Sequence, residues 1–212
     1  MRDIPIFTTE NGVASLVLRE IPYKAVAYIT LQDSQSPDLL LGECVDFCKA
    51  VGAEKIYAKG HAILEKYPLY TTIYQMNRVR EGMPETDACL FPVKEDTIEY
   101  WRSIYNDRME SVPNSATMTI ADSKSLLAKG SGYFVHRNGE LLGIGAIEKD
   151  TVEVIISVIK GAGRDVVLAL CSAMCSESVR LEVSSTNLPA IRLYEKLGFM
   201  KTAELSKWYC IV

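Results

Sequence analysis

Asn187 to Phe199 is the segment that most constrains the fold, because it predicts a short helix between two strands. It follows the strand-like run at 179–183, and Asn187 has a side chain that can cap the first turn of a helix. Pro189 suits that turn, where a missing N–H leaves no hydrogen bond unmade. Apolar side chains then recur at helical spacing until Gly198, which is typical of a helix C-cap. We predict a strand, helix, strand unit; an ordinary surface helix that ends at a glycine is the alternative.

Composition excludes several classes of protein. The chain has 212 residues, of which 48% are hydrophobic and 24% are charged, values typical of a folded globular protein of one or two domains. A net charge of −4 without a block of Lys and Arg argues against a nucleic-acid partner. The N-terminus lacks the apolar core of a signal peptide, and the longest apolar stretch, Val166 to Cys175, is too short to span a bilayer. We therefore expect a cytoplasmic protein without a membrane partner.

The cysteines and histidines do not predict a metal site. There are six cysteines without CxxC spacing, and two histidines. Cys44 and Cys48 are four residues apart, as are Cys171 and Cys175, so each pair shares one face of a helix. Such a pair can bind a metal, but small buried side chains fit the apolar surroundings better. Free thiols also fit the reducing cytoplasm.

The two halves of the chain repeat one order of elements. Asn11-Gly12 and Asn138-Gly139 are both turn dipeptides typical of β-hairpins, each between strand-like runs. A helix with a cysteine pair follows each hairpin, and Cys171 lies 127 positions after Cys44, the offset that also separates the two turns. This constant offset favours an internal duplication over a chance match of two αβ patterns.

A polar segment at 77–87, which contains Gly82 and Pro84, is the predicted linker between the halves. We therefore predict an N-terminal domain over residues 1–82 and a C-terminal domain over residues 83–212. The C-terminal domain opens with an apolar run, followed by an amphipathic helix through Ile98, Trp101, Ile104 and Tyr105.

The C-terminal half resembles the GNAT superfamily of acetyl-CoA-dependent N-acetyltransferases. The resemblance is carried by Asn187 ahead of a short helix, by the run Tyr194-Glu195-Lys196-Leu197-Gly198-Phe199, and by the strand, two-helix, three-strand opening. It implies the GNAT acyl-CoA N-acyltransferase fold, an α/β (α+β) architecture with a mixed, mostly antiparallel central sheet flanked by helices. It covers residues 88–212 well, and residues 1–87 only as a degenerate partial repeat of the same fold. The implied activity is direct transfer of an acetyl group from acetyl-CoA to a primary amine.

In this family a loop after the fourth strand holds the pyrophosphate of CoA, and Lys160 to Asp165 is the matching segment. The family pattern is Gln/Arg-x-x-Gly-x-Gly/Ala, so Lys160 takes the basic position and Gly163 the first glycine. Asp165 replaces the last small residue, and a carboxylate beside a phosphate is unfavourable unless it turns outward or caps the helix. A plain strand-to-helix turn is the alternative. The resemblance implies contacts with acetyl-CoA from Ser157, Val158, Lys160, Gly161, Ala162, Gly163, Arg164, Asp165, Asn187 and Tyr194.

The same loop in the first half, placed by the offset of 127 residues, is Gln32 to Pro37. It contains an acid but neither a glycine nor a basic residue, and no asparagine-capped helix follows the next strand. We therefore expect the N-terminal half to be structural or to shape the acceptor site, without a second CoA site.

Amine acetylation needs a base for the amine, a donor for the developing oxyanion and a proton for the leaving thiolate. By resemblance, Tyr194 supplies the proton to the CoA sulfur, Asn187 holds the pantetheine chain, and the Val158 N–H faces the thioester carbonyl. Glu153 is the candidate base, since a carboxylate within an apolar strand has a raised pKa. The alternatives are a packing role for Tyr194, a simple cap for Asn187 and a solvated strand position for Glu153. No metal is expected to take part.

The sequence does not name the acceptor, because acceptor contacts lie on variable loops. We expect a small-molecule or peptide amine. The main alternative is a non-catalytic acyl-CoA-binding or protein-interaction module of the same fold, favoured by Asp165 and by the loop at 160–165, which is a few residues shorter than is usual in the family. A transferase that uses another acyl group or aminoacyl-tRNA is a second alternative, and the acidic net charge counts against tRNA. The sequence does not indicate the oligomeric state, and a homodimer is compatible with it.

Overall fold

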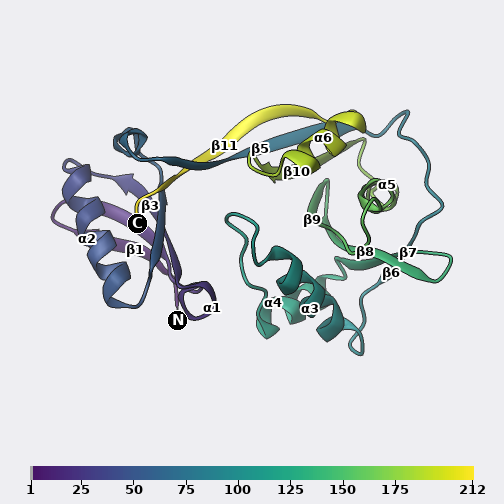
Figure 1. The fold of residues 1–212 in the computed structure, drawn as a ribbon, viewed down its shortest axis with the longest axis horizontal. Helices are drawn as coiled ribbons and strands as arrows, with labels where there is room; N and C mark the ends of the chain where they lie inside the picture. The colour runs from purple at the N-terminus through teal and green to yellow at the C-terminus, as the bar shows by residue number, and fades with distance from the viewer. Residues whose placement is uncertain (1) are drawn as a thin grey trace. The chain divides into compact units, whose positions relative to one another are not determined.

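The structure, a computed structural model, describes residues 2–212 (Figure 1). Contacts group the chain into two compact units. Unit 1 consists of the residues up to Ile73 together with Glu204–Val212, and unit 2 consists of Tyr74–Ala203.

The two units divide the chain differently from the predicted domains 1–82 and 83–212. Two long strands, β5 (Leu69–Val79) and β11 (Met200–Cys210), each begin in one unit and end in the other. The unit boundary therefore falls inside β5, ahead of the polar segment. The return of the C-terminus to unit 1 has no local sequence pattern, because it depends on which strand β11 pairs with.

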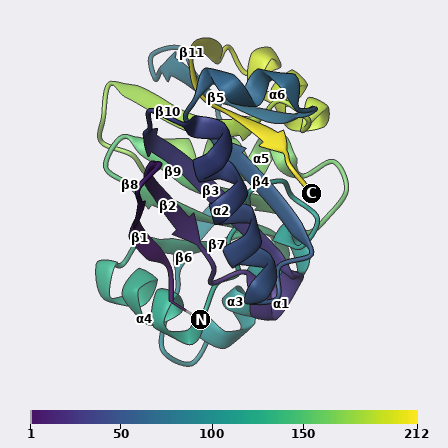
Figure 2. The same cartoon turned by 90° about the vertical axis from the view of Figure 1, so that its left-hand side faces the viewer.

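Unit 1 is a sheet covered on one face by helix α2, which Figure 2 shows in front of the strands. β1, β2 and β3 pair antiparallel, β4 lies parallel to β3, and the end of β11 pairs antiparallel with β4. The hairpin predicted at Asn11-Gly12 joins β1 and β2, and the predicted helix that carries Cys44 and Cys48 is α2. The elements that precede β5 are β1 (Ile4–Thr9), β2 (Gly12–Val17), α1 (Ile21–Lys24), β3 (Val26–Asp33), α2 (Pro37–Ala50), β4 (Lys55–Lys59) and the 3₁₀ helix η1 (Ala62–Lys66).

Unit 2 is a mixed sheet with helices on both faces. Its strand order is β11-β5-β10-β9-β8-β7-β6; β6 to β9 pair antiparallel and β10 is parallel to β9. Phe134 and Val135 are neighbours in β7 but belong to different buried cores, so these cores lie on opposite faces of the sheet. The elements are β6 (Cys89–Pro92), α3 (Ile98–Met109), α4 (Ile120–Lys129), β7 (Gly132–Arg137), β8 (Glu140–Glu148), β9 (Thr151–Ser157), α5 (Gly163–Ser172), β10 (Ser178–Ser184) and α6 (Leu188–Lys196). This architecture confirms the predicted fold class.

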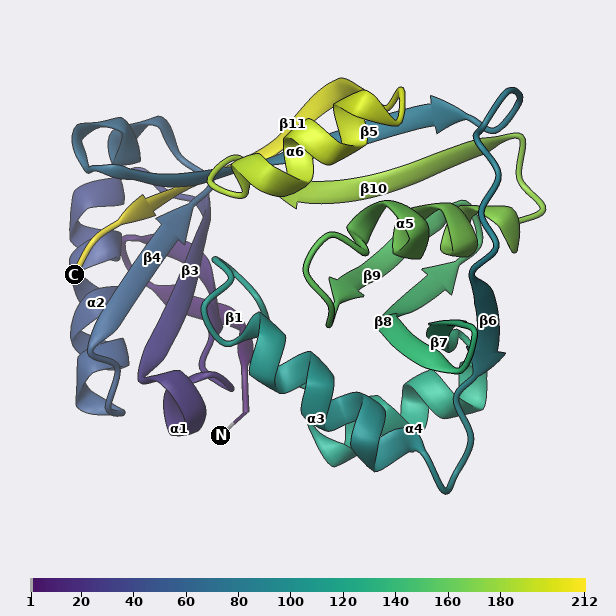
Figure 3. The same cartoon turned by 45° about the vertical axis from the view of Figure 1, so that its right-hand side comes forward.

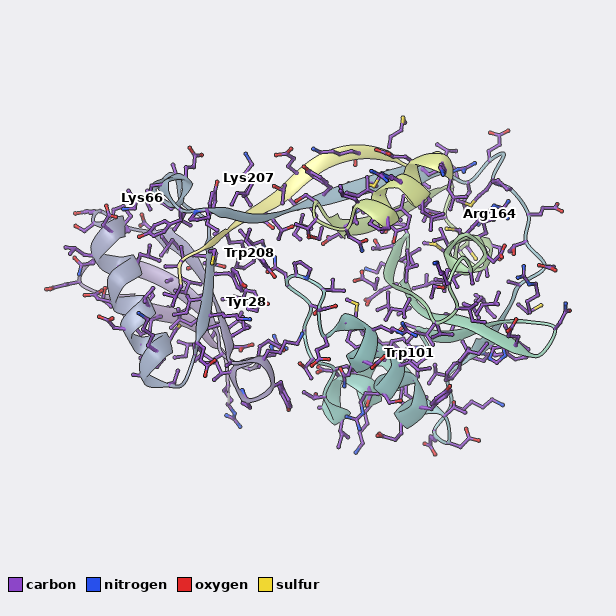
Figure 4. All side chains as sticks on the ribbon, in the orientation of Figure 1. Tyr28, Lys66, Trp101, Arg164, Lys207 and Trp208 are labelled. Atoms are coloured by element: carbon purple, nitrogen blue, oxygen red, sulfur yellow. The ribbon has the colours of Figure 1, made fainter. Side chains whose placement is uncertain are left out.

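The two helical layers of unit 2 pack tightly for different reasons. Helix α5 is buried along Val166–Cys171, and it approaches β8 closely because β8 carries glycine there. A Cβ added at Gly145 would lie 2.4 Å from the Leu170 side chain. On the other face, Trp101 of α3 is 0% exposed and its indole N–H donates to the Tyr133 carbonyl at 3.0 Å (Figure 4).

The predicted repeat is present in the order of elements. β1-β2-β3-α2-β4-η1-β5 corresponds to β7-β8-β9-α5-β10-α6-β11, except that the short α1 lies between β2 and β3 and no helix lies between β8 and β9. The halves differ in the parallel strand pair that follows each hairpin. β3 and β4 pair from Val26↔Lys55 through Thr30↔Lys59, whereas β9 and β10 pair at Thr151↔Arg180 and Val152↔Leu181. The two strands of unit 2 therefore part soon after they meet (Figure 3).

The helical cysteines are mostly packing residues. Cys44, Cys48 and Cys171 are buried, while Cys175 is exposed because α5 ends at Ser172. Burial raises the pKa of the Cys48 thiol to about 11. Among residues 2–212, no three His, Cys, Asp or Glu side chains are grouped so that they could hold a metal ion. No helix of the described chain has both the length and the apolar character needed to cross a membrane.

Candidate active site

A cavity of about 290 Å³ opens where β9 and β10 separate. The strands diverge after Val152 and Leu181, and the end of α3 and the start of α6 complete the wall. Figure 3 shows α6 and β10 on one side of this region and β9 on the other. The lining residues that carry polar side chains are Arg108, Glu153, Ser157, Glu182, Ser184, Asn187 and Tyr194.

Tyr194 lies on α6 and is 6% exposed, yet it lines the cavity. Its ring contacts Phe199, with the centroids 6.0 Å apart, and the structure gives its hydroxyl no hydrogen-bond partner among residues 2–212. Burial, with a smaller effect from Cys171, raises the pKa of Tyr194 above its ordinary value. The hydroxyl therefore stays protonated over the physiological range, and the packing role and the donor role predicted for Tyr194 are compatible.

Asn187 caps α6, as predicted. Its side-chain oxygen accepts a hydrogen bond from the Ala190 N–H at 3.2 Å, and the residue also lines the cavity. The cap uses only the oxygen and leaves the two N–H donors of the side-chain amide to other partners. The cap fixes the start of α6, and with it the position of Tyr194 two turns later.

Glu153 lies on β9 and is exposed, yet it lines the cavity, so the solvated and cavity-lining alternatives both describe it. Burial, and then the nearby Glu182 and Glu148 carboxylates, raise the pKa of Glu153. A carboxylate with a raised pKa takes up a proton more readily, which suits a base.

A second cavity, of about 570 Å³, shares Arg108 and Ser157 with the first. It lies at the start of α5, where Figure 4 labels Arg164. No side chain caps α5 at Ala162. The loop residues that line this cavity are Val158, Lys160, Gly161, Gly163 and Arg164, together with Ile159 and, from α6, Pro189, Ala190 and Leu193.

Asp165 does not point its carboxylate into this second cavity. One oxygen of the carboxylate lies 2.9 Å from the Arg137 guanidinium, and the other accepts from the Thr86 hydroxyl at 3.3 Å. Arg164 is also 3.4 Å from the carboxylate. Asp165 and Ala162 are not among the residues that line the cavity, so their predicted contacts with acetyl-CoA are not supported by side-chain position. The predicted conflict with a phosphate is avoided because Arg137 holds the acid aside.

The role predicted for the Val158 N–H is wrong in this structure. That N–H donates to the Leu142 carbonyl of β8 at 2.9 Å, so it is not free to bind a thioester carbonyl. Because N–H directions alternate along an antiparallel strand, the Ser157 N–H faces the opposite edge of β9, where β10 has separated. Arg108 lies close to this end of β9, since its guanidinium donates to the Val158 carbonyl at 3.3 Å.

Sequence reasoning missed Arg108 and Glu182, which lie on α3 and β10. Glu182 belongs to the alternating run 179–183, and placing 178–184 parallel to 151–157 would have put it beside Glu153. No sequence pattern distinguishes Arg108, because its position depends on how the end of α3 meets β9.

Unit 1 does not reproduce this site. His61 takes the place of the asparagine cap, its ring nitrogen accepting from the Ile63 N–H at 3.1 Å. Leu64, which is 0% exposed, occupies the position that matches Tyr194. β3 and β4 remain paired as far as Lys59, so the corresponding opening is absent from the described unit.

No protein-family model matches the sequence, and no curated protein sequence matches it. Solved structures do match over almost the whole chain. A GCN5-related N-acetyltransferase from Sphaerobacter thermophilus has a TM-score of 0.58 at 12% identity, over 93% of this chain and 75% of that protein. A conserved protein of unknown function from Staphylococcus epidermidis ATCC 12228 has a TM-score of 0.61 at 12% identity, over 96% of this chain and 91% of that protein.

A tandem GNAT protein from the clavulanic acid biosynthesis pathway has a TM-score of 0.56 at 10% identity, over 94% of this chain and 78% of that protein. Identities this low show a shared fold and leave the activity to be argued from the site. This match to a tandem protein agrees with the repeated order of elements in the two halves. The chain therefore has the fold of the GNAT acetyltransferases.

Proposed function

We propose that this protein is an N-acetyltransferase that moves the acetyl group of acetyl-CoA to a primary amine within a ternary complex. The observation that carries the proposal is the separation of β9 from β10, which gathers Tyr194, Asn187 and Ser157 around one cavity. A thioester placed between the strands would meet backbone and side-chain donors there, and an amine could reach it from the side of Glu153.

The second cavity fits the pyrophosphate of acetyl-CoA. An uncapped helix N-terminus presents free N–H groups and the positive end of the helix dipole to an anion. Lys160 and Arg164 add positive charge at the same cavity. Gly161 has a φ of +91°, and a Cβ there would meet nothing within 4 Å, so the backbone is open to a ligand.

The residues of the first cavity divide the chemistry among them. The amine nitrogen forms a bond to the thioester carbon, the carbon–sulfur bond breaks, and the proton of the amine leaves toward Glu153, directly or through water. The Ser157 N–H is the donor placed for the developing oxyanion. Tyr194 faces the leaving sulfur as a protonated donor.

The raised pKa of Tyr194 limits what its hydroxyl can do. A free thiol has a pKa of about 8.5, so complete proton transfer from Tyr194 to a thiolate is uphill unless burial also raises the pKa of the leaving thiol. A strong hydrogen bond that stabilises negative charge on sulfur is the part of the role that the geometry supports best.

The proposal is tested first by binding and then by turnover. Acetyl-CoA should raise the melting temperature, because a ligand that binds only the folded state stabilises it. An amine screen with detection of released CoA thiol follows. No thermal shift at millimolar acetyl-CoA, with a control acetyltransferase responding, would contradict the binding claim. A shift without turnover on any amine class would favour the non-catalytic acyl-CoA-binding module.

A further inference from the structure

We propose that Glu153 and Glu182 together form an acceptor subsite that selects an aliphatic diamine or longer polyamine. The proposal rests on the proposed function and adds the charge class of its acceptor. Both carboxylates line the first cavity, and neither lines the second cavity, which is the one proposed to hold the pyrophosphate of acetyl-CoA.

The two carboxylates stand at the point where the strands part. The last paired positions of β9 and β10 are Val152 and Leu181, so Glu153 and Glu182 are the next residue on each strand. Val152 and Leu181 are both buried, and alternation along a strand turns the next side chain to the other face. Glu153 and Glu182 therefore share one face, and both line the same cavity.

No cation of the described chain neutralises this pair. The structure shows no ion pair for either carboxylate among residues 2–212. Lys129, whose charge acts on Glu153, is bonded to Glu148 at 2.9 Å. Arg108, which also lines the cavity, is directed to the Val158 carbonyl and to Asp107.

Both carboxylates are exposed, and like charges on neighbouring strands repel each other, so a positively charged ligand bound at this place would relieve that repulsion. Tyr194 supplies an independent sign that a ligand belongs in the cavity. Its side chain is buried, its hydroxyl has no protein partner among the described residues, and it lines the same cavity as the carboxylates.

The dimensions fit an extended acceptor. Four residues of strand separate Glu153 from Ser157, which is about 13 Å along β9. A reacting nitrogen placed between the Ser157 N–H and Glu153 can lose its proton to Glu153 through water, and a short alkyl chain then carries a second ammonium group to Glu182, with the Glu153 charge beside it. Two negative charges favour a dication over a monocation, and they repel an acceptor that carries its own carboxylate.

Three amines with four-carbon chains differ in charge and test this preference. They are 1,4-diaminobutane, a dication; butylamine, a monocation; and 4-aminobutanoate, which carries its own carboxylate. We expect kcat/KM and binding affinity to fall in that order. Binding is measured by calorimetry with CoA present, so that the acceptor subsite is tested even if turnover fails. A triamine, N-(3-aminopropyl)-1,4-diaminobutane, extends the series in case the second ammonium must lie further away.

Glu182→Gln should weaken binding of the diamine about 10- to 100-fold, the range for loss of a charged hydrogen bond, and should change butylamine binding much less. Glu195→Gln, an exposed acid on α6 outside the cavity, is the matched control and should change neither. Equal affinity for diamine and butylamine, equal loss of both in Glu182→Gln, or no binding of either the diamine or the triamine would overturn the proposal. Diamine binding that depends on Glu182 without acetyl transfer would uphold the subsite and contradict the proposed function.

Discussion

Tyr194→Phe separates a catalytic donor from a packing residue more sharply than any other single change in this chain. The substitution keeps the ring and its contact with Phe199 and removes only the hydroxyl. That hydroxyl has no protein partner among residues 2–212 and faces the cavity. The free energy of unfolding should therefore change by less than about 1 kcal/mol, the usual net value of one hydrogen bond.

The effect on turnover should be far larger than the effect on stability. A positioned donor contributes roughly 100- to 1,000-fold to an acyl transfer of this kind, equivalent to about 2.7 to 4 kcal/mol of activation free energy. Because the hydroxyl would act when charge develops on sulfur, acetyl-CoA affinity should change little while kcat falls. The raised pKa of Tyr194 adds a second expectation: no loss of activity from its ionisation should appear below about pH 10.

The assay combines three measurements on wild type and Tyr194→Phe. Thermal or urea unfolding reports stability, calorimetry with acetyl-CoA reports affinity, and single-turnover release of CoA thiol reports the chemical step. Tyr105→Phe, which removes a hydroxyl from a buried tyrosine in the other core of unit 2, is the control. Full single-turnover activity in Tyr194→Phe would refute the donor role. A fall in stability that accounts for the lost activity would assign Tyr194 to packing alone.

Five further predictions follow from the structure. Glu153→Gln should slow turnover most near neutral pH and least as the pH approaches the amine pKa of about 10.4, where the amine loses its proton unaided; a pH–rate profile tests this. Because the folded-state pKa of Glu153 is raised, ionisation destabilises the fold, so the same variant should melt higher than wild type at pH 7 and show a smaller difference at pH 4. Arg137→Ala should release the Asp165 carboxylate beside the α5 N-terminus and weaken acetyl-CoA binding about 2- to 5-fold, and Asp165→Asn added to it should restore the affinity measured by calorimetry. Gly145→Ala should cost about 1–3 kcal/mol of stability through overpacking against Leu170, whereas Gly42→Ala, with open space around it in α2, should stabilise by roughly 0.5–1 kcal/mol in the same unfolding assay. Calorimetry should give one acetyl-CoA site per chain, because β3 and β4 stay paired where β9 and β10 separate; a second site would contradict that reading of unit 1.

The features that could be predicted from the sequence are those set by a few neighbouring residues. The turn at Asn138-Gly139 and the cap at Asn187 depend on local backbone conformation and local hydrogen bonds, and both are present. The repeated order of elements could also be predicted, since hairpin turn and cysteine pair keep one spacing. The fold class follows from that order.

The features that could not be predicted depend on pairing between distant segments. The end of β11 lies against β4, a choice of partner that neither strand encodes by itself. The salt bridge between Asp165 and Arg137 joins α5 to β7, so the direction of the Asp165 carboxylate depends on how these two elements pack. The partner predicted for the Val158 N–H is wrong for the same reason, because strand register decides which edge of the strand each N–H faces.

The contrast between the two halves gives a physical reason for the site to lie in unit 2. In unit 1, β3 and β4 satisfy their backbone groups on each other through Thr30↔Lys59, and Gly60 lets β4 stay close, since a Cβ there would lie 2.2 Å from the Leu31 carbonyl oxygen. In unit 2, separation of β9 from β10 leaves donors such as the Ser157 N–H to water or to a ligand. Ser157 is half-buried, and the thioester carbonyl of the proposed acyl donor would take the place of water at its N–H. β9 and β10 thus make fewer hydrogen bonds to each other than β3 and β4, and they leave backbone groups open to a ligand. The longer pairing of β3 and β4 stabilises unit 1 and leaves no such opening there.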